Sequence, residues 1–253
     1  MADAIPPDAR RVRWFSAGAA SAVALRMDVA EFGPDAGPAC YIDTGSEHPD
    51  NPRFIADVAE WVGIDVQVLR SDRYTSVDDV IERRRYLNGP AGALCTTELK
   101  KKVRQALQRP DDVQVFGYTA DKKDAERAER FAANNFEVNL CTPLIAAGLT
   151  KGNVLAIIER AGIRLPAMYV LGYRNNNCIG CVKGGAGYWN KVRLDFPDVF
   201  ARRAAQERNI GHSCLGDVFL DELDPAAGNY AAEEIACSLD CVPVEALWTG
   251  DPS

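Results

Sequence analysis

Cysteine is the residue type of this chain with the most distinctive chemistry, because it occurs eight times and two of the thiols stand close together. Cys178 and Cys181 are separated by two residues, which lets both sulfur atoms ligate one metal, and Gly180 permits the bend that this requires. A redox dithiol of the thioredoxin type opens a helix after an early strand, whereas this pair lies in an asparagine- and glycine-rich loop far along the chain. The pair therefore predicts a metal site.

The identity of the metal is open from the spacing alone. Cys95 and Cys214 would complete a four-thiolate zinc site with the pair, and an iron–sulfur cluster uses ligands of the same kind. His48 and His212 are the two histidines of the chain, and neither lies in a metalloprotease or deaminase signature. We therefore expect thiolate ligation and exclude histidine-dependent hydrolase chemistry.

The other four cysteines form two groups. Cys40 and Cys141 lie within or beside apolar segments that should be strands, so we interpret them as packed core thiols. Cys237 and Cys241 lie near the C-terminus, where an exposed tail can carry a thiol into a remote site; a tail without function fits equally. Disulfides are disfavoured because the first residues lack the apolar run of a signal peptide and the cytosol keeps thiols reduced.

A short stretch of small residues is a second candidate site. Residues 16–21 read Ser-Ala-Gly-Ala-Ala-Ser and join a predicted strand to an apolar helix. Small residues let backbone N–H groups close on an anion, the helix N-terminus adds partial positive charge, and the hydroxyls of Ser16 and Ser21 add donors. We therefore predict that this loop, with Gly18 at its centre, binds phosphate; a tight turn that only packs helix on sheet is the alternative.

Polar residues also follow two other predicted strands. Asp43, Thr44 and Gly45 end the second strand, and Gly117 ends the fourth, ahead of a helix that carries Arg127. Open α/β sheets bind ligands outside the carboxyl ends of their strands, so we expect these residues to join the nucleotide site. A solvent-facing helix stripe explains Arg127 as well.

These residues need a scaffold, and the alternation of apolar runs with helix-like segments predicts one. It indicates an α/β fold: a Rossmann-like parallel sheet with flanking helices, followed by a mostly helical and irregular C-terminal part. The expected strands are residues 12–16, 39–43, 66–69 and 113–118. The expected helices are residues 19–31, 52–62, 77–87, 97–107, 121–133, 151–161 and 198–208, with Thr150 and Pro197 as start signals for the last two.

Composition sets the limits on the class of protein. At 253 residues, 47% hydrophobic, the chain can bury one large core, and we expect a nucleotide-binding domain over residues 1–145, a helical cysteine-containing part over 146–220 and a tail over 221–253. The net charge of −7 argues against a generally basic nucleic-acid-coating protein but allows local basic sites, such as Lys100 to Lys102 with Arg104. No segment has the length of a membrane span, so we expect a soluble cytoplasmic protein.

Three of these features occur together in one family. The chain resembles the phosphoadenosine phosphosulfate reductase-like branch of the PP-loop (adenine nucleotide α-hydrolase) superfamily. Residues 16–21 are similar to the superfamily's Ser-Gly-Gly-x-Asp-Ser loop, and residues 43–45 to its turn after the second strand. Residues 94–100 resemble the Cys-Cys-x-x-x-Lys stretch of iron–sulfur sulfonucleotide reductases, and Cys178 with Cys181 their second cysteine pair. Residues 175–189 resemble uncharacterised, often phage-associated members of the branch.

The resemblance implies a sulfonucleotide reductase-like oxidoreductase that binds an adenine nucleotide, carries a [4Fe–4S] cluster and uses a thiol reductant such as thioredoxin. The resemblance implies that the cluster is bound by Cys95, Cys178 and Cys181, with Cys214 as the candidate fourth ligand. It implies that phosphate or sulfate charge is neutralised by Lys100, Lys102 and Arg127, and that Lys100 is also catalytic. It implies that the nucleophile is Cys237 or Cys241 of the tail.

Two departures from the family pattern keep other functions open. Ala20 replaces the aspartate of adenylating members, and Leu94 replaces the first cysteine of the reductase pair. An open cluster on three cysteines would instead suit ATP-dependent thiolation of a nucleic acid, with a [4Fe–4S] iron carrying sulfur. A non-enzymatic, zinc-stabilised nucleotide-binding module is the third hypothesis.

Overall fold

The chain folds around a five-stranded, all-parallel sheet, in a computed structural model that describes residues 8–89 and 92–230. The strand order is β3-β2-β1-β4-β5, so β1 lies centrally between β2 and β4. The strands are β1 (Arg11–Trp14), β2 (Ala39–Ile42), β3 (Val66–Leu69), β4 (Val113–Phe116) and β5 (Asn139–Cys141).

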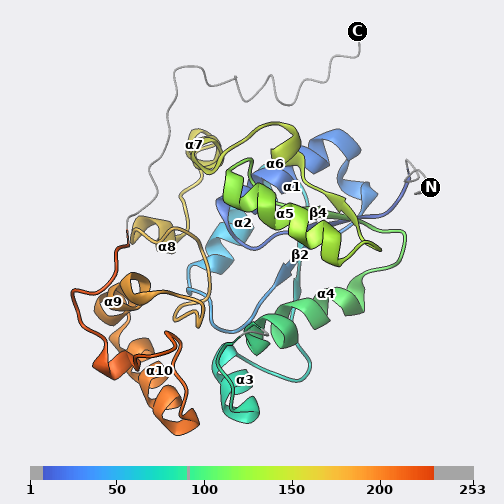
Figure 1. The fold of residues 1–253 in the computed structure, drawn as a ribbon. Helices are drawn as coiled ribbons and strands as arrows, with labels where there is room; N and C mark the ends of the chain where they lie inside the picture. Colours follow the sequence, from blue (N-terminus) through green and yellow to red (C-terminus); the bar gives the residue numbers. More distant parts are fainter. Residues whose placement is uncertain (1–7, 90–91, 231–253) are drawn as a thin grey trace.

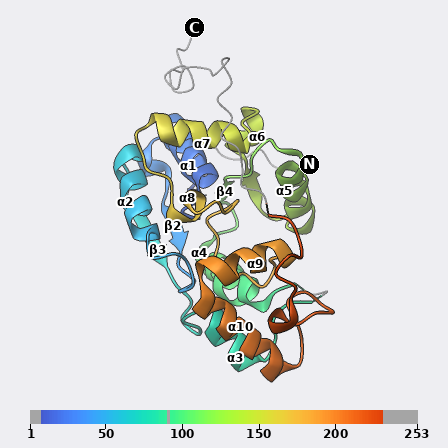
Figure 2. The same ribbon diagram turned by 90° about the vertical axis from the view of Figure 1, so that its left-hand side faces the viewer.

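Helices cover both faces of the sheet and extend beyond one edge (Figures 1 and 2). The first half of the chain contains α1 (Ala19–Phe32), η1 (Pro34–Ala36), α2 (Asn51–Val62), α3 (Val77–Arg84), the π-helix η2 (Thr96–Lys101), α4 (Lys102–Leu107) and α5 (Lys122–Asn134). The second half contains α6 (Pro143–Ala146), α7 (Lys151–Arg160), α8 (Ala167–Val170), α9 (Ala186–Asp195), α10 (Pro197–Ile210) and η3 (Leu220–Glu222).

The first hydrophobic core lies between the sheet and a helix layer formed by α1, α2, α6 and α7. Phe15 packs its ring 6.1 Å from that of Phe54, and both side chains are buried. Figure 2 shows α1 and α2 on one side of the sheet and α5 on the other. This layer holds α1 rigidly, and the N-terminus of α1 begins the predicted phosphate loop.

Two buried arginines of β1 share one carboxylate of α1. Arg11 and Arg13 donate to opposite oxygens of Asp28, at 2.5 Å each, and all three side chains are under a tenth exposed. Breaking such a buried pair strands an uncompensated charge, so this triad locks α1 to the central strand.

A second hydrophobic core lies beyond the carboxyl edge of the sheet. It is formed by α3, η2, α8, α9, α10 and η3, with Trp189 fully buried in it. Segments from before and after residue 145 contribute to both cores. Residues 221–230, which we expected to begin a tail, pack here: Leu223 is buried, and Tyr230 lies against the rings of Tyr173 and Tyr188.

The predicted α/β class and parallel sheet are confirmed. Thr150 begins α7 with a reciprocal cap to Asn153, and Pro197 opens α10. The prediction of one α-helix over residues 97–107 was wrong, because η2 makes up its first part. Strand β5 and helices α6, α8 and α9 were missed; they are short or begin in glycine-rich sequence. Among the described residues, no helix has the length and apolarity needed to cross a membrane.

Candidate functional site

The predicted phosphate loop is a strand-to-helix turn organised by one serine. Ser21 Oγ accepts a hydrogen bond from the Ser16 amide at 3.0 Å and donates to the Gly18 carbonyl at 2.9 Å, while Ser16 Oγ lies 3.1 Å away. Ser21 is buried and Ser16 is exposed. The first turn of α1 has no acidic residue and no side-chain cap, so its N–H groups are available to an anion. Ser21 therefore shapes the loop, and Ser16 faces outward.

Gly117 allows β4 to approach this loop. A Cβ atom added there would lie 2.7 Å from both the N and Cα atoms of Ser21, so a side chain would force the two segments apart. The next residue, Tyr118, is half-buried, and the guanidinium of Arg127 lies 5.5 Å from its ring centroid. Arg127 also pairs with Asp124 at 2.6 Å and is largely exposed. The two strands beside the topological switch point thus end together, as ligand sites of open sheets require.

The turn after β2 contacts the loop that carries the cysteine pair. Asp43 accepts from the Gly45 amide at 2.8 Å and pairs with Arg70 at 2.7 Å. Thr44 is buried, and its hydroxyl donates to Glu47 Oε1 at 2.5 Å. A lone pair of the same hydroxyl faces the Sγ atom of Cys178 at 3.1 Å. Thr44 therefore contacts the cysteine pair directly.

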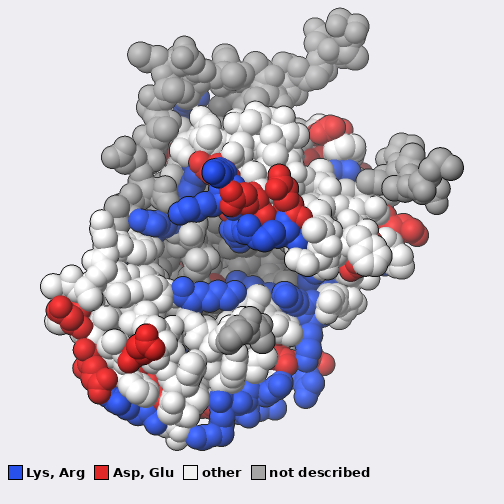
Figure 3. All heavy atoms as spheres, in the orientation of Figure 1, with Lys and Arg blue, Asp and Glu red and all other residues white. Residues whose placement is uncertain are grey.

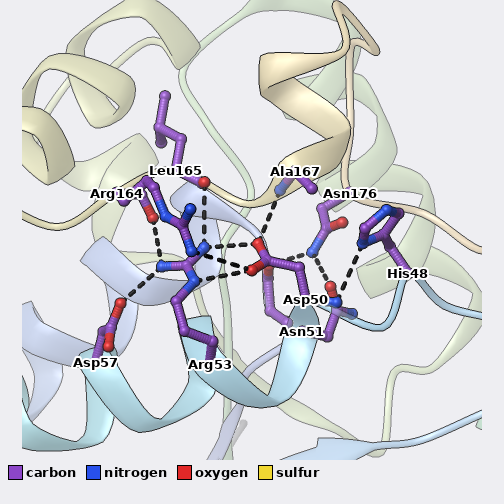
Figure 4. Close-up of polar contacts among 10 residues, drawn as sticks. His48, Asp50, Asn51, Arg53, Asp57, Arg164, Leu165, Ala167 and Asn176 are labelled. Atoms are coloured by element: carbon purple, nitrogen blue, oxygen red, sulfur yellow. Dashed lines mark hydrogen bonds and ion pairs between the residues drawn. The ribbon is translucent and has the colours of Figure 1, made fainter.

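The loop that carries the cysteine pair contacts both strand-end loops. Asn176 donates from Nδ2 to the Ala17 carbonyl at 2.6 Å and to Asn51 Oδ1 at 2.8 Å, and Figure 4 shows it reaching toward Asn51. The Ile179 amide donates to the Ser46 carbonyl at 2.8 Å. Residues 16–21, 43–47 and 176–181 therefore form one contiguous site, although they lie far apart in the sequence.

An ion-pair network beside this loop fixes the start of α8. Asp50 accepts from the Ala167 amide at 3.0 Å and pairs with Arg53 at 2.6 Å, and Arg53 donates to the Arg164 and Leu165 carbonyls (Figure 4). The Arg53 hydrogen bond, partly opposed by burial, lowers the pKa of Asp50. The network ties the chain just before the cysteine loop to the first turn of α2.

Lys100 lies among the predicted metal ligands. Burial lowers the pKa of Lys100, but the neighbouring Cys178, Glu47, Cys181 and Cys95 outweigh burial and raise the pKa above its usual value. Cys181 also contributes to the raised pKa of Cys95 and of Cys178, so these thiols lie near one another.

The buried thiols are poor nucleophiles in the metal-free chain. Burial raises the pKa of the Cys178 thiol to about 12, and burial also raises the pKa of Cys95. For Cys214, burial and then the Glu207 carboxylate raise the pKa; that carboxylate accepts from the Cys214 amide at 2.6 Å. A thiol with a raised pKa carries little thiolate at neutral pH, so these residues suit ligation with proton release better than attack on a substrate.

The donor set fits a thiolate-bound metal in its chemistry. Cys178 and Cys214 belong to the second core, Cys95 packs against it, and the Cys181 amide donates to the Tyr188 hydroxyl at 2.9 Å. The Lys100 cation can balance an anionic cluster. Within residues 8–89 and 92–230, no three metal-binding side chains converge as a preformed ion site. Cys237 and Cys241, the predicted nucleophiles, lie outside the described residues.

A hollow with basic rims opens beside this site. Figure 3 shows Lys and Arg side chains along both sides of it, between α5 and the η2–α4 segment, with Asp and Glu side chains among them on the α5 side. Lys102 is already paired, at 2.7 Å, with Glu98 of η2. Positive charge around a hollow favours a negatively charged ligand.

From the sequence we named Arg104 only as part of a local basic run, and the structure shows that it is buried without an ion pair among the described residues. Its side chain is 9% exposed, its guanidinium lies 4.9 Å from the ring of Phe131, and its Nε atom has no hydrogen-bond partner. Arg11, Arg13 and Arg203, the other buried arginines of the described segments, each pair with an aspartate. The position of Arg104 in the basic run of residues 100–104 was the available signal, and only the fold shows that it is buried.

The comparisons with known proteins agree with this geometry. Residues 10–184 match the model of the phosphoadenosine phosphosulfate reductase domain, a stretch that includes all three loops of the site. No curated protein matches the chain. Because the match covers more than half of the residues, the chain belongs to the phosphoadenosine phosphosulfate reductase domain family.

Proposed function

We propose that the chain is a sulfonucleotide reductase-like enzyme that binds an adenosine 5′-phosphosulfate beside an iron–sulfur cluster. The observation that carries this proposal is the contact of one cysteine loop with both strand-end loops: Asn176 reaches Ala17, and Cys178 reaches Thr44. These contacts support one shared site for nucleotide binding and sulfur chemistry. In this proposal residues 1–145 bind the nucleotide, residues 146–220 supply the cysteine pair, and residues 221–253 carry the nucleophile.

The phosphosulfate would lie at the N-terminus of α1, where free backbone N–H groups and the hydroxyl of Ser16 face outward. Arg104 is suited to hold a further anionic group, because a buried guanidinium without a carboxylate partner gains a charge-assisted hydrogen bond only from a ligand. Lys100 would add positive charge on the side of the thiols.

In the proposed reaction, the thiolate of Cys237 or Cys241 attacks the sulfur atom of the sulfonyl group. An S–S bond forms, the bond between that sulfur and the bridging phosphate oxygen breaks, and the nucleoside phosphate leaves with the oxygen. An external dithiol of the thioredoxin type then attacks the enzyme sulfur, releases sulfite and restores the thiolate as its own disulfide forms.

The proposed cluster ligands are Cys95, Cys178 and Cys181, with Cys214 as the fourth. When bound, the cluster would supply electrostatic polarisation near the sulfonyl group. The residues of this chain do the rest: α1 orients the phosphate, and Lys100 balances the thiolate charge.

The test is sulfite release from adenosine 5′-phosphosulfate and its 3′-phosphorylated form, with dithiothreitol under anaerobic conditions. We expect release by the wild-type chain and its loss in a Cys237→Ser, Cys241→Ser double variant. Cys40→Ser is the matched control, because Cys40 is a buried core thiol on β2. Full activity in the double variant would overturn the proposed nucleophile.

The hollow with basic rims favours a second candidate, ATP-dependent thiolation of a nucleic acid. Such a partner would use the positive charge on both rims, and a three-cysteine cluster would leave one iron open for sulfur. Ala20 counts against it, because adenylating relatives keep an aspartate there. Release of AMP and pyrophosphate from ATP only when RNA or DNA is present would favour this candidate over reduction.

A further inference from the structure

We propose that Asn176 is a positioning residue that couples metal binding at the cysteine pair to the shape of the phosphate loop. The inference rests on the proposed function, because it assigns the coupling to the nucleotide and metal of that site. It adds a residue whose side chain touches neither the expected metal nor the expected phosphate.

Asn176 is buried, with 7% of its surface exposed, although it lies in a polar loop between two exposed asparagines. Its Nδ2 group donates both of its available hydrogen bonds, to the Ala17 carbonyl and to Asn51 Oδ1. Asn51 in turn donates to the Tyr41 hydroxyl at 3.2 Å, which fixes which end of its amide faces Asn176. The orientation of Asn176 is therefore set by two acceptors, since a flipped amide would place oxygen against oxygen.

Asn176 contacts Ala17, a residue with an unfavourable backbone conformation. Ala17 has a φ of +55°, in the left-handed region that residues other than glycine rarely adopt. It is fully buried and stands between β1 and the N-terminus of α1. An unfavourable backbone conformation needs surrounding contacts to persist, and the Asn176 amide holds its carbonyl in place. The N–H groups that follow then keep their direction toward the ligand.

The cysteine pair lies directly after Asn176 in the same loop. Cys178 is two residues away and contacts Thr44, and the Ile179 amide binds the Ser46 carbonyl. Ligation of Cys178 and Cys181 by one metal would restrict this loop, and Asn176 would transmit the restriction to Ala17. By linkage, nucleotide binding must then strengthen metal binding by the same factor.

The experiment compares three chains, each metal-free and loaded with iron and sulfide or, failing that, with Zn²⁺. They are the wild type, Asn176→Ala, and Asn177→Ala as matched control, because Asn177 is the exposed neighbour of the same type. The dissociation constant of adenosine 5′-phosphosulfate is measured by calorimetry in both states. We expect metal to tighten binding by roughly 5- to 100-fold in the wild type and the control, and to change it less than about twofold in Asn176→Ala.

The deciding quantity is the ratio of the nucleotide dissociation constants without and with metal. An asparagine with a purely structural role would weaken binding equally in both states, so a ratio in Asn176→Ala equal to that of the wild type overturns the inference. If Asn176→Ala does not fold, amide hydrogen exchange of residues 16–21 is measured in the wild-type chain with and without metal. We expect metal to slow this exchange, and an unchanged exchange rate overturns the inference. A wild-type chain that binds nucleotide equally with and without metal overturns the inference alone. A chain that binds no adenine nucleotide in either state overturns the proposed function with it.

Discussion

Replacing Arg104 by methionine should weaken nucleotide binding while leaving the protein as stable as before, or more stable. Arg104 is 9% exposed, and its side chain makes no hydrogen bond or ion pair to the described residues. Burial lowers its pKa, which reflects the cost of keeping its charge there. Methionine has a similar length and no charge, so it removes that cost and keeps the packing against Phe116 and Phe131.

Arg104→Met should lower the nucleotide affinity but not the free energy of unfolding. A hydrogen bond from a charged donor contributes about 1.5–3 kcal/mol, so binding of adenosine 5′-phosphosulfate should weaken roughly 10- to 150-fold. The free energy of unfolding should stay equal or rise by about 1 kcal/mol, by analogy with the replacement of unpaired or costly buried charges. Calorimetry and urea unfolding measure the two quantities on the same sample.

Arg203→Met is the matched control, because Arg203 is also buried but pairs with Asp78 at 2.9 Å. Removing it leaves Asp78 with Arg202 as an arginine partner, at 2.8 Å, but takes the donor from the buried Gln206 Oε1, so the chain should lose about 1–3 kcal/mol of stability. The reasoning is refuted if Arg104→Met loses as much stability as Arg203→Met, or if its nucleotide affinity equals that of the wild type.

Three further predictions address the scaffold of the site. Asp28→Asn leaves two buried guanidinium groups without their carboxylate and should cost about 3–5 kcal/mol in urea unfolding; a loss under 1 kcal/mol would contradict the role of this triad. Gly117→Ala places a methyl group against the Ser21 backbone and should cost about 1–3 kcal/mol, with weaker nucleotide binding; an unchanged affinity would show that the loop can shift freely. Because the pKa of Asp50 is lowered in the folded chain, its pairing with Arg53 stabilises the fold at pH values above the ordinary aspartate pKa, and this stabilisation is lost as pH falls through the lowered pKa. The melting temperature should therefore fall less between pH 7 and pH 2 in Asp50→Asn than in the wild type.

The sequence predicted the scaffold well where strong local signals exist. Apolar strands flanked by long helices have a clear pattern, and Thr150 and Pro197 mark helix starts through their capping chemistry. Strand β5 escaped prediction because it has three residues with a polar first member, and its strand character comes from pairing with β4. The π-helical turn of η2, in which Leu99 and Glu98 are buried, has no local sequence signal of its own.

The sequence suggests residues for the site but not the contacts between them. Serine and glycine in the first loop and the spacing of Cys178 and Cys181 carry chemical meaning within a few residues. The links from Asn176 to Ala17 and from Thr44 to Cys178 join positions more than 130 residues apart, and no local pattern encodes them. Burial of Arg104 also depends on α5 packing over β4, which a basic run cannot reveal.

The central claim is that sulfur ligands and nucleotide share one site, and one titration tests it most directly. The visible absorption of the anaerobically purified chain is recorded, with its iron, sulfide and zinc content, as adenosine 5′-phosphosulfate is added. We predict a brown protein with iron and acid-labile sulfide whose spectrum changes saturably with the nucleotide. A colourless protein with stoichiometric zinc, or a cluster spectrum that the nucleotide leaves unchanged, would contradict the account.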